Sequence, residues 1–276
     1  MGKVLFLAII LLISANLVFA KESPTDFKVY GVKINVQSLE KGVEFYSGVM
    51  GFKIEKINLA LREVYLLSGD NRKIILKETA EKLFPDEGDY SCTSFALQVN
   101  SLDSTLKKLG EKGVKFFEKE KRTEGIGFSL HYYDPFGNIF SMVEVTIGER
   151  KTIDEPKLYN FGYYIPDIQK GMDFYSTKIG FIERTKKYMP EDMPLYHADN
   201  SFGFMLHLNR KDWGLRKDVN GKNAVNLVFS TKNLAQAQEN LKKLGIKTSK
   251  PMPSIGGQYF SFQDNYGIRV DLIESL

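Results

Sequence analysis

The chain has 276 residues, of which 43% are hydrophobic and 26% charged, and its formal net charge is +4. This composition excludes a disordered or membrane-embedded protein, and the length suits two domains of ordinary size. Because Lys and Arg are interspersed with Asp and Glu rather than gathered in a block, nucleic acid is not expected as the main partner.

Residues 1–20 differ from the rest of the chain. Lys3 precedes an apolar run from Val4 to Ile13, and Val18-Phe19-Ala20 resembles a signal peptidase site. This pattern predicts a signal peptide over residues 1–20, cut after Ala20, and therefore an exported protein, periplasmic or secreted, with no stable membrane anchor after cleavage. The alternative is an uncleaved anchor, for which the apolar run is short.

The remaining sequence repeats itself on either side of a charged linker at residues 148–156. Each half opens with a strand-like stretch, at residues 31–36 and 160–165. A helical pattern follows that contains Phe-Tyr-Ser and ends in Gly-Phe, at residues 45–52 and 174–181. Glycine at this point suits a left-handed helix stop, and the equal spacing in both halves indicates an internal duplication.

Two short strand-like runs come next in each half, at 63–67 and 73–77 and again at 195–198 and 202–208. Each half then continues with a strand (94–99; 226–229), a helix containing Leu-Lys-Lys-Leu-Gly (106–110; 241–245) and two strands joined by a tight turn. The turns read Asp134-Pro135-Phe136-Gly137-Asn138 and Asp264-Asn265-Tyr266-Gly267. The sequence therefore predicts an α+β protein built from four βαβββ units.

The order of elements, the Phe-Tyr and Gly-Phe pairs and the Asp-Pro-Phe-Gly-Asn turn resemble the vicinal oxygen chelate superfamily, which includes glyoxalases, bleomycin-resistance proteins and extradiol dioxygenases. The resemblance covers nearly all of residues 27–275. It implies an N-terminal module at 27–147 and a C-terminal module at 157–275, with curved mixed sheets. Whether each module closes its own cup, within one chain or with a second chain, is left open, as is the choice between monomer and homodimer.

In the metal-dependent members of that superfamily, four inward-facing strand positions supply His and Glu ligands. The resemblance places the second-half positions at Asn160, His207, Asn226 and Asp271, of which only His207 and Asp271 are strong metal ligands. The first-half positions contain no competent ligand set, which predicts that the N-terminal module is a structural half without metal; they are Gly31, Ile75, Ser94 and Ser141.

Even without a metal, the second half predicts a small-ligand site. Strand alternation places Arg269 and Asp271 on one face, where they would join an imidazole and two amides in an apolar cavity. The expected ligand-binding residues are Asn160, Tyr164, His207, Asn226, Arg269 and Asp271. Two alternatives remain: His207 and Asp271 could pair with each other or with Arg269 as a satisfied buried network, and the two asparagines could cap strand ends.

Five other features carry weaker expectations. His131 and His197 are expected to serve packing or the surface. The Gly256-Gly257 pair is either a turn or a lid at the mouth of the cup. Trp213 suits a cup wall or the core, and Cys92, the single cysteine, suits a buried thiol.

Three functions are therefore open. The first is a binding module that takes a small polar or aromatic molecule in the C-terminal cup without a tightly bound metal. The second is an enzyme, a glyoxalase-like or dioxygenase-like lyase, isomerase or oxygenase, in which His207 and Asp271 hold a divalent metal ion or act as an acid/base pair. The third is a scaffold that keeps only the fold.

Overall fold

The computed structural model describes residues 26–80, 93–124, 127–146, 153, 155–183, 195–197, 203–208 and 224–274. The expected signal peptide, Cys92 and Trp213 lie outside these residues. None of the described helices is long and apolar enough to cross a membrane.

The prediction of an α+β chain of four βαβββ units is confirmed. The first unit contains β1 (Lys28–Val36), α1 (Leu39–Val43) continued by η1 (Glu44–Val49), β2 (Lys53–Asn58), β3 (Glu63–Leu67) and β4 (Lys73–Glu78). The second contains β5 (Thr93–Gln98), α2 (Leu102–Glu111), β6 (Arg122–Glu124), β7 (Gly127–Tyr133) and β8 (Ile139–Val145).

The third unit contains β9 (Lys157–Ile165), α3 (Ile168–Met172) continued by η2 (Asp173–Lys178), β10 (Ile182–Glu183), β11 (Leu195–His197) and β12 (Gly203–Leu208). The fourth contains β13 (Val225–Thr231), α5 (Leu234–Lys243), β14 (Met252–Ser254), β15 (Gly257–Gln263) and β16 (Arg269–Glu274).

Local chemistry explains where the helices begin and end. Ser38 precedes α1 and Asp167 precedes α3, and the side chain of each accepts a hydrogen bond from the backbone amide three residues later. This satisfies a helix amide that would otherwise lack a partner. After η1 and η2 the chain passes through Gly51 (φ 89°) and Gly180 (φ 87°), the left-handed stops that the sequence predicts.

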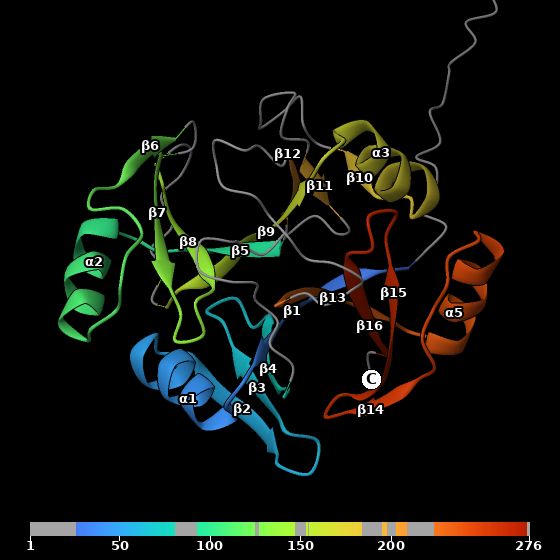
Figure 1. Cartoon of the computed structure of the whole chain (residues 1–276), viewed down its shortest axis with the longest axis horizontal. Coiled ribbons are helices and arrows are strands. Elements are labelled where there is room, and N and C mark those ends of the chain that lie inside the picture. The colour runs from blue at the N-terminus through green and yellow to red at the C-terminus, as the bar shows by residue number, and fades with distance from the viewer. Residues whose placement is uncertain are drawn as a thin grey trace, which may run out of the picture.

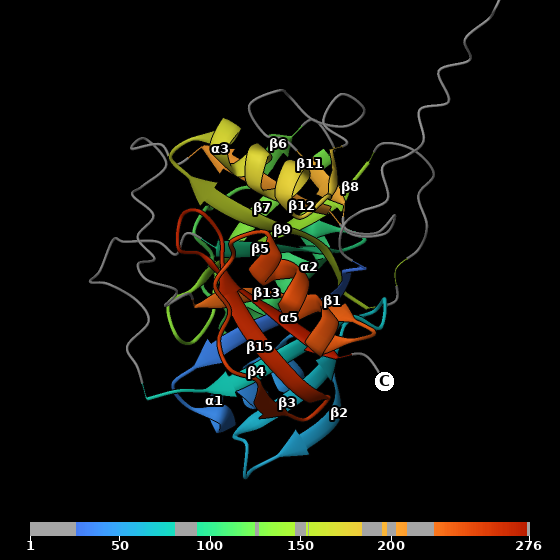
Figure 2. The same ribbon diagram turned by 90° about the vertical axis from the view of Figure 1, so that its right-hand side faces the viewer.

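The strands form two eight-stranded mixed sheets that pair units from opposite halves of the chain. Sheet I has the order β14-β15-β16-β13-β1-β4-β3-β2, and sheet II has the order β10-β11-β12-β9-β5-β8-β7-β6. The first unit therefore pairs with the fourth through β1 and β13, and the second pairs with the third through β5 and β9. In Figure 1 the blue and red units share the lower sheet, while the green and yellow units share the upper one; Figure 2 shows the same division from the side.

Each face of sheet I has its own set of neighbours. Side chains alternate along a strand, so Val32 and Ile34 of β1 join the large core beneath the helices, together with Leu227 and Phe229 of β13. The residues between them face the other way. There a second, smaller apolar cluster fills the hollow of the sheet; its members are Tyr65, Ile75, Val228, Tyr259 and Ile273.

One buried tyrosine–aspartate hydrogen bond joins the two units within each half of the chain. Tyr46 of η1 donates to Asp134 Oδ2 (2.8 Å), and Tyr175 of η2 donates to Asp264 Oδ2 (3.0 Å). The Phe-Tyr motif of one unit thus holds the tight turn of the next unit. These turns also fold onto their own carboxylates, since the backbone amides of residues 136 and 138, and of 266 and 268, donate to Oδ1.

Both turn aspartates are expected to titrate near pH 6. Burial raises the pKa of Asp134 and of Asp264 to about 6, although the donated hydrogen bonds oppose it. Because the folded state holds these protons more tightly than the unfolded state, each group lowers the free energy of unfolding by up to about 3 kcal/mol as pH rises from about 4 to about 6, with no further change above. NMR titration of the two carboxyl carbons measures this directly, and midpoints at or below pH 4 would contradict it.

Candidate functional site

The structure divides the expected ligand-binding residues between the two sheets. Asn160 and Tyr164 lie on β9, and His207 lies on β12 at the register position beside Tyr164, all in sheet II. Asn226 lies on β13, and Arg269 and Asp271 lie on β16, in sheet I. The expectation of one shared cavity in the C-terminal half is therefore wrong.

The error has a physical cause in the pairing of the strands. The four second-half positions were expected to share a cavity, whereas β1 of the first unit pairs with β13 of the fourth and separates them between two sheets. Lys33 lies opposite Asn226 on β13 and beside Ile75 on β4. The first unit, expected to belong to a purely structural module, therefore supplies one side of the site.

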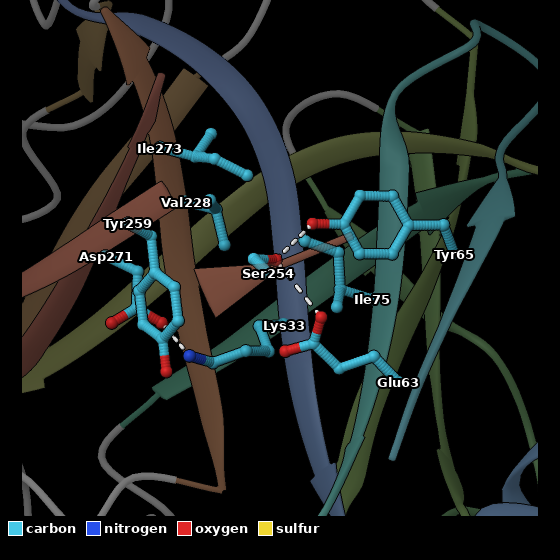
Figure 3. Close-up of a pocket in the computed structure, with 9 residues that line it drawn as sticks. All are labelled: Lys33, Glu63, Tyr65, Ile75, Val228, Ser254, Tyr259, Asp271 and Ile273. Carbon is cyan, nitrogen blue, oxygen red and sulfur yellow. Dashed lines mark hydrogen bonds and ion pairs between the residues drawn. The ribbon is translucent and has the colours of Figure 1, made fainter. Parts of the chain in front are cut away.

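A small cavity lies in the hollow of sheet I, where the first and fourth units meet (Figure 3). The space open to the centre of a water molecule is about 10 Å³, which is room for about one water. Charged side chains reach this cavity from both units, and apolar side chains line the rest. The lining residues are Lys33, Glu63, Tyr65, Ile75, Val228, Ser254, Tyr259, Asp271 and Ile273.

The centre of the site is a buried ion pair between Lys33 and Asp271, which are 5% and 1% exposed. Lys33 Nζ contacts Asp271 Oδ2, and it also stands 4.8 Å from the centre of the Tyr259 ring. Figure 3 shows the ammonium pointing across the hollow toward the carboxylate. The pair bridges β1 near the start of the described chain and β16 near its end.

Three further donors complete the surroundings of the Asp271 carboxylate. Asn226 Nδ2 donates to Oδ2 (3.1 Å), while Ser261 Oγ (2.5 Å) and Arg269 Nε (3.0 Å) donate to Oδ1. With Lys33, each carboxylate oxygen accepts from two donors, which is the full capacity of an ionised carboxylate. Burial alone would raise the pKa of Asp271, but the Lys33 and Arg269 charges and these hydrogen bonds outweigh it and hold the pKa below its usual range.

A strap of the fourth unit, residues 252–257, closes the cavity against β3 of the first unit. Glu63, which is 2% exposed, accepts hydrogen bonds from Ser254 Oγ (3.1 Å) and from the Ile255 amide (3.2 Å). Tyr65 donates to Ser254 Oγ (2.7 Å), since the serine hydroxyl hydrogen is already given to Glu63. A Cβ on Gly256 would meet Ile273 Cδ1 at 2.8 Å, so glycine lets the strap lie close over the cavity.

The donor set of this site does not fit a divalent metal ion. Of the four side chains that meet at the centre of sheet I, Lys33 is a cation, Ile75 is apolar, Asp271 has no lone pair left, and Asn226 offers one neutral amide oxygen. A metal ion needs several free, partly anionic donors to replace its water. Within the described ranges no cluster of three or more His, Cys, Asp or Glu side chains could hold one.

The same positions in sheet II are occupied by residues without charge. Gly162 lies opposite Ser94, as Lys33 lies opposite Asn226, and Met205 lies beside Gly162, as Ile75 lies beside Lys33. Ser141 lies beside Ala96, as Asp271 lies beside Val228. Sheet II therefore has no counterpart of the ion pair at these positions.

Two expectations about single residues can be compared with the structure. His131 is half-buried on β7, where its Nδ1 lies 2.7 Å from Glu118 Oε1, in agreement with a packing role. His197 lies on β11, and its backbone pairs with Ile182. Neither residue belongs to the sheet I cavity.

Lys33, Glu63, Tyr65, Tyr259 and Ser261 were missed by reasoning from the sequence. One signal was available for Lys33, because it is the only charged residue in the run from Gly31 to Val36. Gly31 and Lys33 are two residues apart and share a face, so strand alternation could not choose between them. The others become part of a site only through pairing between distant strands.

Comparison with known proteins agrees with the fold. The family model described as Glyoxalase/Bleomycin resistance protein/Dioxygenase superfamily matches residues 29–142 and 157–272. No curated protein sequence matches the chain significantly. Glyoxalase I from Zea mays has a similar structure, with a TM-score of 0.62, 17% identity, and coverage of 90% of this chain and 92% of that one. A candidate dioxygenase from Bacillus subtilis gives a TM-score of 0.65, 15% identity, and coverage of 90% and 85%. Such low identities show the fold alone.

Removal of the buried ammonium should destabilise the fold strongly. We expect Lys33→Met to lower the free energy of unfolding by about 3 to 5 kcal/mol, because it leaves the Asp271 carboxylate buried without its main partner. The matched control is Lys28→Met on the same strand, where the side chain is exposed, with an expected change below about 0.5 kcal/mol.

A double-mutant cycle measures the coupling between Lys33 and Asp271. Chemical denaturation gives the free energy of unfolding of Lys33→Met, of Asp271→Asn and of the variant that carries both substitutions. The double variant should lose less stability than the two single variants added together. Equal effects of Lys33→Met and Lys28→Met would show that the ion pair contributes nothing.

Proposed function

Because this chain belongs to the glyoxalase/bleomycin resistance protein/dioxygenase superfamily, we propose that it binds a small polar or aromatic molecule in the sheet I cup without a tightly bound metal. The site lies where the first and fourth units meet. All the residues that line the cavity come from one chain. A small molecule, rather than nucleic acid, is the proposed partner.

One observation carries this proposal: Asp271, the strongest candidate ligand in sheet I, already accepts hydrogen bonds from Lys33, Asn226, Ser261 and Arg269. The Lys33 ammonium supplies the positive charge at the bottom of the cup. Polar groups that converge between aromatic and aliphatic walls are typical of ligand sites, which favours binding over a purely structural role.

The enzymatic alternative receives less support from the geometry. An acid/base pair of His207 and Asp271 requires both side chains at one substrate, but the two residues belong to different sheets. A general base works best with a pKa near the operating pH, and the pKa of Asp271 is instead held low by its partners. Asp271 is therefore a structural anion in this proposal.

Metal analysis of the protein purified without chelator tests the proposal. We expect no stoichiometric metal, and no stabilisation by Zn²⁺, Ni²⁺ or Mn²⁺ in thermal denaturation. As a positive control, Lys33→His combined with Ile75→Glu places an imidazole and a free carboxylate beside Asp271. This variant should gain about 2.7 kcal/mol at a Zn²⁺ concentration a hundredfold above its Kd.

Stoichiometric metal that is lost on Asp271→Asn would overturn the metal-free assignment and support the enzymatic alternative. A thermal-denaturation screen with small molecules of mixed charge tests binding itself. If no compound of any charge class stabilises the protein, only the scaffold function remains.

We also propose that the protein is exported, on the strength of the apolar run and the Ala20 cleavage motif. After expression in a bacterial host with the native leader, the mature chain should begin at Lys21 and occur in the periplasmic or medium fraction. N-terminal sequencing and intact mass measure this. Recovery of the full-length chain in the membrane fraction would favour the uncleaved anchor.

A further inference from the structure

We propose that the outer edge of β2 binds the same edge of a second copy of this chain, so that sheet I continues across a two-fold axis. This inference goes beyond the proposed binding function and does not depend on it. It follows from the exposed apolar side chains of β2, from the order of its charges and from a comparison with the other sheet edges.

β2 is the terminal strand of sheet I, so one of its edges pairs with β3 and the other pairs with no strand among the described residues. Both views of the molecule show β2 at its lower margin (Figures 1 and 2). Of the five large apolar side chains that are exposed in the described ranges, three lie on β2 or the turn after it: Ile54 (45%), Ile57 (52%) and Leu59 (76%). An open strand edge with apolar side chains is a template for pairing with another strand.

The other three sheet edges are better protected. β6 reads Arg-Thr-Glu, and β14 contains Pro253 and continues into the strap that binds Glu63. β10 has two described residues, the exposed Ile182 and a glutamate. Charges, proline and short length are common means by which proteins prevent edge pairing. β2 has six residues, and its charges are of both signs, which suits a partner with the same sequence.

A β-bulge brings Ile54 and Ile57 onto one face of β2. Glu55 is the extra residue of this bulge in the pairing with β3, so Ile54 lies opposite Leu66 and Ile57 lies opposite Val64. Leu66 and Val64 both belong to the large core beneath the helices. The two isoleucines therefore extend the apolar face of sheet I to its margin, where nothing among the described residues covers them.

One antiparallel register, with the two-fold axis between Glu55 and Lys56, matches the apolar and the charged residues at once. It places Ile54 opposite the partner's Ile57, and Glu55 opposite the partner's Lys56. Symmetry makes each contact twice. A shift by one residue in either direction would place Glu55 opposite itself or Lys56 opposite itself. Cross-strand apolar pairs and opposite charges stabilise a sheet, whereas like charges destabilise it, so the sequence of β2 selects this register. The two bulges meet at the axis and stay in register.

Both charged side chains are available for the contact. Lys56 Nζ makes one long contact among the described residues, 3.5 Å from Ile255 O, at an exposed position. Glu55 pairs with Lys73 through Oε1, which leaves further acceptor sites on its carboxylate. Six residues a side form a small interface compared with the roughly 20 to 30 of a standard one, so the dimer should dissociate on dilution.

Charge reversal tests the register by sedimentation equilibrium over a range of protein concentrations. Glu55→Lys and Lys56→Glu each bring like charges together at both symmetry-related contacts, so each should weaken dimerisation at least tenfold. An equimolar mixture of the two variants should form dimers with the affinity of the wild type, because each strand then faces opposite charges. A variant that had merely misfolded would not recover on mixing.

A second pair of variants tests the apolar contact. Ile54→Thr combined with Ile57→Thr keeps β-branched side chains but removes apolar surface, and should weaken dimerisation at least tenfold. The matched control is Ile182→Thr on β10, an equally exposed isoleucine at the edge of sheet II, which should leave the dimer unchanged.

Three results would overturn the inference. The first is wild-type protein that stays monomeric at the highest concentration reached. The second is a dimer that resists either charge reversal or the double threonine variant, which would place the interface elsewhere. The third is a mixture of the two charge variants that stays monomeric, which would show that Glu55 and Lys56 do not meet. None of these results bears on ligand binding in the sheet I cup, which the small-molecule screen measures separately.

Discussion

The structure of the sheet I site depends on one buried ion pair, between the Lys33 ammonium and the Asp271 carboxylate. Transfer of either charge out of water costs several kcal/mol, so neither Lys33 nor Asp271 is tolerable without the other. Asn226, Ser261 and Arg269 complete the shell of the carboxylate. β1 and β16 lie on either side of β13, and this register brings the two charged side chains together.

The pairing of the first unit with the fourth places the buried ion pair between the two ends of the described chain. The second and third units form the same architecture with uncharged residues at the corresponding positions, such as Gly162 and Ser94. Duplication has thus given two equivalent sheets of which one keeps a charged centre. The strap belongs to the fourth unit and is held by β3 of the first, so closure of the cavity depends on the same long-range contact as the site itself.

Sequence patterns predicted the helices, strands and turns of this fold, but they did not predict which strands pair with one another. Glycine stops, Phe-Tyr pairs and Asp-centred turns act within a few residues, and Gly51, Gly180, Asp134 and Asp264 play the local roles that their spacing indicates. Strand alternation also predicted which face each residue occupies. Nothing local specifies whether β1 lies beside β5 or beside β13, because both neighbours bury the same kind of surface. The candidate site was therefore assembled from the right residues of one sheet and unrelated residues of the other.

The donors at the centre of sheet I differ from a metal ion in what they offer a ligand. A metal ion polarises an oxygen ligand strongly and offers vacant coordination positions, whereas Lys33 offers directional N–H donors of fixed charge. All four acceptor sites of the Asp271 carboxylate are occupied by donors from neighbouring residues. The carboxylate therefore has no lone pair with which to accept a proton from a substrate. The unpaired Asn226 Oδ1 can accept a hydrogen bond but cannot move a proton at neutral pH. Directional donors and acceptors between apolar walls are the kind of groups by which a protein recognises a small ligand.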